Sequence, residues 1–198
     1  MNNPISYVLP DGLGFPLQSF LHHLYPRICL ACNHKLPPVD SHICLFCEVK
    51  LPKTNFHQNP NNRFAQRFWG KVNIEAGAAM YYFKKGSRPQ HLIHNLKYKN
   101  KPEIGTVIGE LFGRLLKDTR PYSMADLIVP VPLHWKKLRK RGYNQSAMFA
   151  NGLSEAMGIP VDRFGLRRIE NSVSQTRKSR IERLQNVDKK FEVNEASK

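Results

Sequence analysis

The chain has 198 residues, enough for one medium domain and a small appendage. Its hydrophobic content of 41% supplies an ordinary core, and no apolar run approaches the ~20 residues that a membrane-spanning helix needs. The formal net charge is +16, with the largest excess of Lys and Arg in residues 133–198, which predicts a polyanion or a phosphorylated small molecule as partner. A merely basic surface is the alternative.

The first element expected along the chain is a short amphipathic helix within residues 1–26. Apolar residues recur at helical spacing between Phe15 and Leu24, and Pro26 ends the pattern. Because this segment has no basic face of its own, packing against the rest of the protein is favoured over contact with a membrane.

Residues 27–52 hold two CxxC motifs separated by eleven residues. Each motif can aim two thiolates at one point, so two motifs facing each other across a short hairpin predict a four-sulfur zinc ribbon. Two disulfides are the alternative, which is disfavoured because nothing at the N-terminus resembles a secretory signal. The predicted ligands are the four cysteines of the chain, Cys29, Cys32, Cys44 and Cys47.

Two histidines, His34 and His42, lie close to these motifs in the sequence. Because four sulfurs already complete a tetrahedron, we expect both histidines at the surface. The segment that follows, residues 53–70, is rich in Asn, Gln and Pro, which is typical of a linker. The second domain is therefore expected over residues 71–198.

This second domain carries extended and helical patterns in turn. An extended segment over residues 72–83 is followed by two helices, the first capped by Ser87 and the second beginning after Pro102. The apolar run 126–132 has no polar alternation and is typical of a buried parallel strand, and a further helix is predicted over residues 144–157. The order predicts an α/β domain with a parallel sheet, whose functional loops lie beyond the carboxyl ends of the strands.

The segment after the apolar run has five basic residues within six positions, and it is expected to be a loop between a strand and a helix. Gly142 lets the backbone approach a ligand, and the helix that follows offers N–H groups, so the loop predicts a phosphate or nucleic-acid site. A solvated basic turn is the alternative. The candidate residues are Arg139, Lys140, Arg141, Asn144 and Gln145.

Two further segments are candidates of the same kind. Lys97 and Lys99 flank Tyr98, and a ring between cations suits single-stranded nucleic acid, where a base stacks while the cations hold phosphates. A helix C-terminus explains these lysines equally well. The second segment, within residues 163–183, has few acids, and an amphipathic helix with a solvated face is its alternative. It contributes the candidates Arg177, Lys178, Arg180 and Arg183.

Taken in order, these motifs resemble the ComF family. The resemblance rests on the four-cysteine ribbon, on His-Asn-Leu-Lys-Tyr-Lys at 94–99, on the Pro-Val-Pro strand followed by Arg-Gly-Tyr-Asn-Gln at 141–145, and on Gln-Thr-Arg-Lys-Ser-Arg at 175–180. It implies a zinc ribbon with structural Zn²⁺ joined to a type I phosphoribosyltransferase-like domain, in proteins associated with DNA uptake by competent bacteria. For an intact member it also implies a site for phosphoribosyl pyrophosphate (PRPP) and Mg²⁺.

The sequence departs from the family pattern in one respect. The phosphoribosyltransferase signature joins two adjacent acidic residues to a Thr-Thr-Gly-type loop, and neither occurs in the 198 residues. The family pattern places both just after Phe191. We therefore interpret the phosphoribosyltransferase-like domain as incomplete at its C-terminus and expect the chain to transfer no phosphoribosyl group.

Three hypotheses follow. The leading one is a cytoplasmic competence factor that binds incoming single-stranded DNA, with peripheral attachment at the inner membrane as the alternative location. The second is a PRPP-dependent phosphoribosyltransferase. The third is an adaptor whose ribbon docks other proteins of the competence machinery and which has no ligand of its own.

Overall fold

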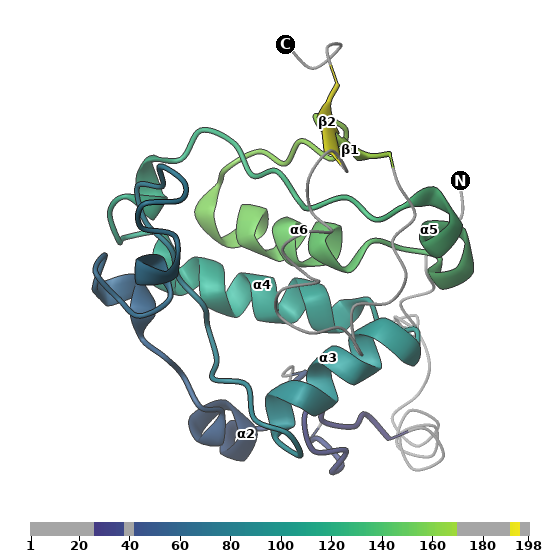
Figure 1. The fold of residues 1–198 in the computed structure, drawn as a ribbon. Coiled ribbons are helices and arrows are strands. Elements are labelled where there is room, and N and C mark those ends of the chain that lie inside the picture. Colours follow the sequence, from purple (N-terminus) through teal and green to yellow (C-terminus); the bar gives the residue numbers. More distant parts are fainter. Residues whose placement is uncertain (1–25, 38–41, 170–190, 195–198) are drawn as a thin grey trace. The chain divides into compact units, whose positions relative to one another are not determined.

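The computed structural model describes residues 26–37, 42–169 and 191–194 (Figure 1). The chain divides into two compact units, Met1–Lys50 and Leu51–Lys198. No helix in the described ranges is long and apolar enough to cross a membrane. The helix expected between Phe15 and Leu24 lies outside these ranges, as do the candidates Arg177, Lys178, Arg180 and Arg183.

The described part of the first unit is a turn followed by a short helix. An antiparallel bridge between Ile28 and Lys35 closes the turn, where Asn33 takes a left-handed φ of 62°, a conformation that Asn tolerates well. Helix α2, Leu45–Lys50, follows. The second CxxC motif was expected in a hairpin, and it instead opens this helix because its two cysteines, three residues apart, share one side of a helical turn.

The described part of the second unit contains four α-helices and three 3-10 turns. The helices are α3 (Arg88–Tyr98), α4 (Glu103–Leu116), α5 (Trp135–Arg141) and α6 (Gln145–Met157). The 3-10 turns are η1 (Phe56–Gln58), η2 (Ala65–Arg67) and η3 (Tyr122–Met124). The sequence predictions of α3, α4 and α6 are confirmed. The prediction of a loop over α5 is wrong, and Ser87 precedes α3 without making the expected side-chain cap, since its hydroxyl donates to Lys84.

Residues 53–70, which composition marks as a linker, hold η1 and η2 in the second unit. Asn62 is buried at the centre of this segment. Its amide donates to the carbonyl groups of Phe56 (3.0 Å) and Gly77 (2.6 Å), and its oxygen accepts from the N–H of Ala65 (3.0 Å). These hydrogen bonds satisfy the polar groups of the buried side chain and connect η1, η2 and residue 77.

The hydrogen-bonded sheet of the described residues is small and antiparallel. Strand β1, Leu166–Arg168, pairs with β2, Phe191–Val193, in the register Leu166↔Val193. Arg167 donates two hydrogen bonds to Glu192 across the pair (2.9 and 2.6 Å), and the guanidinium of Arg168 lies over the ring of Phe191. Neither strand was predicted.

The expected parallel sheet is reduced, in the described part of the chain, to one parallel bridge between Ile128 and Val161. Alternate residues of a strand face the same neighbour, so Pro130 and Pro132 fall on the side of Ile128. Proline has no N–H to donate, which ends the pairing after one bridge. The segment 72–83 likewise forms no strand and makes one antiparallel bridge, from Tyr81 to Lys53.

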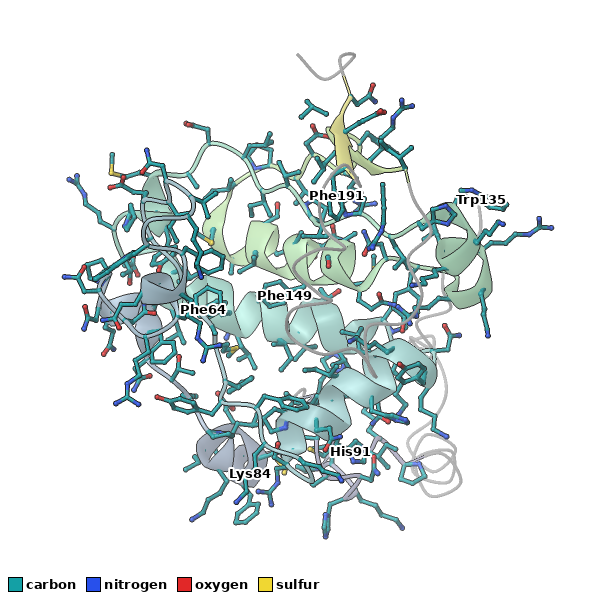
Figure 2. The ribbon with its side chains drawn as sticks, viewed as in Figure 1. Phe64, Lys84, His91, Trp135, Phe149 and Phe191 are labelled. Atoms are coloured by element: carbon teal, nitrogen blue, oxygen red, sulfur yellow. The ribbon has the colours of Figure 1, made fainter. Side chains whose placement is uncertain are left out.

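Helices α4 and α6 run side by side, and glycines bring their backbones into contact (Figure 1). A Cβ atom at Gly109 would overlap the carbonyl oxygen of Phe149, and one at Gly152 would overlap that of Thr106. Figure 2 shows Phe149 beside α4, where its ring lies 6.3 Å from that of Phe112. The buried apolar residues of this contact are Ile104, Phe112, Leu116, Ala147 and Ala150.

We expect Gly152→Ala to destabilise the protein although alanine is the better helix former by about 1 kcal/mol. Two packed backbones cannot make room for a methyl group, and overpacking of this kind costs roughly 1–3 kcal/mol or more. Urea unfolding followed by circular dichroism measures the loss. Gly86→Ala is the matched control, because nothing lies within 4 Å of its Cβ position and only its positive φ opposes the change. Equal, small losses in both variants would contradict the glycine-mediated contact.

Candidate metal centre and basic surface

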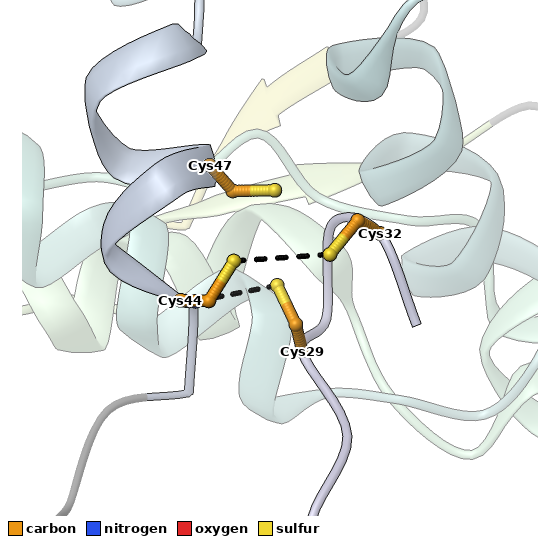
Figure 3. A group of neighbouring side chains, drawn as sticks. All are labelled: Cys29, Cys32, Cys44 and Cys47. Atoms are coloured by element: carbon orange, nitrogen blue, oxygen red, sulfur yellow. Dashed lines mark hydrogen bonds between the residues drawn. The ribbon is translucent and has the colours of Figure 1, made fainter. Parts of the chain in front are cut away.

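The four cysteine side chains of the first unit converge on one point (Figure 3). All four sulfur atoms lie within 4.8 Å of one another, and those of Cys32 and Cys44 are 3.8 Å apart. A tetrahedron with metal–sulfur bonds of about 2.3 Å has edges of about 3.8 Å, so the cluster fits a four-coordinate metal ion. The cysteines are free thiols, which disfavours the disulfide alternative.

Backbone N–H groups stabilise the thiolate form of one cysteine in this cluster. Burial raises the pKa of Cys29, but the N–H groups of Cys44, Ala31 and Cys32 outweigh it and lower that pKa to about 7. The N–H of Cys44 donates to the Cys29 sulfur over 3.3 Å. Burial and the neighbouring thiols raise the pKa of Cys47, so without a cation the four sulfurs cannot all be thiolates. A metal ion at this site would supply that cation, and tetrahedral sites of four thiolates are typical of zinc.

The two nearby histidines take no part in this cluster. His34 and His42 are both exposed, as expected, and the metal-site geometry involves the four cysteines. The carbonyl group of His34 accepts from the N–H of Cys29 (2.8 Å), and that of His42 accepts from the N–H of Leu30 (3.0 Å). Both histidines therefore serve the first CxxC motif through their backbone.

We predict one equivalent of zinc per chain, which stabilises the first unit because so small a segment has little core of its own. Metal analysis of the purified protein measures the content, and Cys44→Ser should lower it and loosen the unit. Ser41→Ala, just outside the motif, is the control. Less than half an equivalent of zinc, together with unchanged unfolding of Cys44→Ser, would contradict the prediction.

The basic segment after the apolar run is helix α5, in place of the predicted loop. Its N-cap is His134, whose Nδ1 accepts from the N–H of Lys136 over 3.3 Å. It ends at Gly142, with a left-handed φ of 83° and nothing within 4 Å of its Cβ position. This glycine therefore terminates a helix, in the left-handed conformation that glycine adopts most easily. Arg139, Lys140 and Arg141 fill the last turn, where the helix dipole favours cations.

The next two candidates, Asn144 and Gln145, lie at the N-terminus of helix α6. Asn144 is the N-cap of α6: its oxygen accepts from the N–H of Ser146 (3.1 Å), and its amide donates to the carbonyl of Val131 (3.0 Å). Gln145 faces an apolar cavity of about 600 Å³, and its buried Nε2 has no partner among the described residues. The N-terminus of α6 is thus capped by Asn144, as the sequence predicted, and the binding role of Asn144 and Gln145 stays a prediction.

Two basic segments far apart in the sequence meet at the ends of α3 and α5. The guanidinium of Arg141 lies over the ring of Tyr98, 5.8 Å from its centroid, and the hydroxyl of Tyr143 donates to the carbonyl of Leu96. These contacts bring Lys97 and Lys99, both exposed, beside the last turn of α5. The structure therefore joins two of the three basic segments that the sequence singled out.

Strand β1 adds a further cation to the same place. Burial and the charges of Arg168 and Arg141 lower the pKa of Lys137. Burial also lowers the pKa of His134, and the charges of Lys136, Arg168 and Lys137 lower it further, which favours the neutral imidazole. We call this region the α5 basic surface. It comprises Lys97, Tyr98, Lys99, Trp135, Lys136, Lys137, Arg139, Lys140, Arg141 and Arg168.

Sequence reasoning missed one aromatic residue of this surface. Trp135 begins α5 with 59% of its surface exposed, and Figure 2 shows its side chain directed away from the helices. The ammonium of Lys136 lies 5.4 Å from the ring centroid. The sequence held the signal, because Trp135 directly precedes a run of cations. Tyr98 was selected as a candidate on the same ground, an aromatic ring next to cations.

The geometry thus defines a protein with a candidate four-cysteine metal centre in one unit and a basic surface in the other. No protein-family model and no solved structure matches the chain. A curated relative, Competence protein F of Haemophilus influenzae, is 28% identical over 103 residues. The aligned region covers 50% of this chain and 45% of the relative, so the match spans less than half of that protein. This distant similarity supports the assignment of the chain to the ComF family.

Proposed function

We propose that this chain acts in competence by binding single-stranded DNA on the α5 basic surface, while zinc stabilises the four-cysteine unit. The observation that carries the proposal is the meeting of α3 and α5 at Tyr98 and Arg141, which gathers cations from two segments. The similarity to a competence protein supports the cellular role.

Charge favours a polyanion as the ligand. The chain carries a net charge of +16, and Arg139, Lys140 and Arg141 form no ion pair with any described residue. Holding like charges together costs free energy: burial lowers the pKa of Lys137, and the charges of Arg168 and Arg141 lower it further. Phosphates along a nucleic acid would relieve this repulsion and release counterions at the same time.

Aromatic residues favour a single strand over a duplex. Tyr98 and Trp135 are 60% and 59% exposed, and both lie within the cluster of cations. Unpaired bases can stack on such rings, each stack being worth roughly 1–3 kcal/mol, whereas the bases of a duplex are already stacked on one another.

We predict salt-sensitive binding to oligothymidine, with affinity falling by about 0.7 log unit per log unit of salt for each phosphate contacted. The triple variant Arg139→Ala, Lys140→Ala and Arg141→Ala should flatten this slope by roughly two to three contacts. Fluorescence anisotropy at several salt concentrations measures it. The matched control replaces three exposed lysines away from this surface, Lys84, Lys85 and Lys117, by alanine. If both triple variants change the slope equally, binding is diffuse and the α5 basic surface is not the site.

The exposed face of α2 favours a second candidate, an adaptor function. Leu45, Phe46 and Val49 are 75%, 59% and 70% exposed, and exposed apolar clusters are typical of protein-docking surfaces. Absence of DNA binding at low salt, with stoichiometric zinc retained, would favour this candidate. The phosphoribosyltransferase alternative has its own test: release of pyrophosphate from PRPP and Mg²⁺ with candidate bases would show turnover and replace the DNA-binding proposal.

A further inference from the structure

We propose that Trp135 is the base-stacking platform of the α5 basic surface, so that one base of a single strand lies on the indole while adjacent phosphates contact the cations beside it. This inference rests on the proposed function. It assigns a ligand group, the nucleobase, to one named side chain.

The indole is exposed and yet held in place. Trp135 is the first residue of α5, and the ring of His134 lies 5.7 Å from it at an interplanar angle of 33°. His134 itself is only 5% exposed, and its Nδ1 is fixed by the hydrogen bond from the N–H of Lys136. A rigid ring therefore supports the indole, which reduces the entropy lost when a base stacks on it.

The support works only while His134 is neutral, because Nδ1 must accept that hydrogen bond. The cations that face the imidazole are Lys136 and Lys137 from α5 and Arg168 from β1, and together with burial they lower its pKa. Lys136 also lies 5.4 Å from the centroid of the indole, and the imidazole that Lys137 and Arg168 face is in ring contact with the indole. A base on Trp135 would thus have phosphate-binding groups from two elements next to it.

The other aromatic residue of this surface is less available. Arg141 lies over the ring of Tyr98, and the ring of His94 lies 5.1 Å away from it. The guanidinium of Arg141 would have to move before a base could stack on the face of the phenol ring that it covers. Near Trp135 the corresponding cation is Lys136, a long side chain whose ammonium can move to a phosphate.

The chain has two tryptophans, which allows a direct test. Trp69→Phe leaves Trp135 as the single indole of the full chain. We expect oligothymidine to quench its fluorescence, and an abasic oligonucleotide of equal length and phosphate number to bind with little quenching. Trp135→Ala should weaken binding of oligothymidine by about 5- to 150-fold, and Trp135→Phe by much less. Affinity for the abasic strand and the salt slope should stay unchanged in both variants.

Each outcome separates the inference from the proposed function. If oligothymidine binds with the expected salt slope but causes no quenching, or if Trp135→Ala weakens both oligonucleotides equally, the platform is refuted while DNA binding stands. If neither oligonucleotide binds, the proposed function itself fails. The third outcome is a blue shift of the Trp135 fluorescence when the Trp69→Phe protein is mixed with vesicles containing anionic lipid, without quenching by oligothymidine. It would overturn the inference and assign Trp135 to a membrane surface. Quenching of the Trp69→Phe protein needs no change at Trp135, so it remains decisive if the alanine variant misfolds.

Discussion

The contact between α4 and α6 determines where the residues of the α5 basic surface lie. Because Gly109 and Gly152 let the two backbones touch, α6 has one position against α4. The N-terminus of α6 then holds the end of the apolar run through Asn144, whose amide donates to Val131. Tyr143, between α5 and α6, donates to the carbonyl of Leu96 and so fixes α5 against the C-terminus of α3. The packing of α4 and α6 thus sets the geometry of the residues proposed to bind a ligand.

Two helix ends explain how so many cations can gather without a bound partner. Four cations of this surface, Lys97 of α3 and Arg139, Lys140 and Arg141 of α5, lie in the last turn of their helix, where unpaired carbonyl groups carry partial negative charge. This compensation is local and reaches about one turn, so it offsets part of the repulsion only. Some repulsion remains, since the charges of Arg168 and Arg141 add to burial in lowering the pKa of Lys137. A ligand with several phosphates would therefore compete for these cations only with helix carbonyl groups, which are weak partners.

Features set by local spacing could be predicted from the sequence, and features set by tertiary contact could not. The CxxC spacing predicted the cysteine cluster, and apolar periodicity predicted α3, α4 and α6, because both depend on residues within a few positions of one another. Helix α5 was missed because seven residues with five cations have little apolar periodicity. The α4–α6 contact was missed because the periodicity that locates a helix counts apolar side chains, whereas this contact depends on glycines. The place of Arg168 depends on β1, whose partner strand lies far along the sequence.

The two units depend on charge in opposite senses. Four converging sulfurs, with one pKa lowered to about 7, need a cation before all of them can be thiolates. The α5 basic surface gathers cations and gains from an anion. Metal–thiolate bonds are short and buried, so salt screens them little, whereas contacts between exposed cations and phosphates weaken steeply as salt rises. Chelation and salt therefore act on different units, and a chelator that abolished DNA binding at low salt would show that the α5 basic surface requires an intact metal centre.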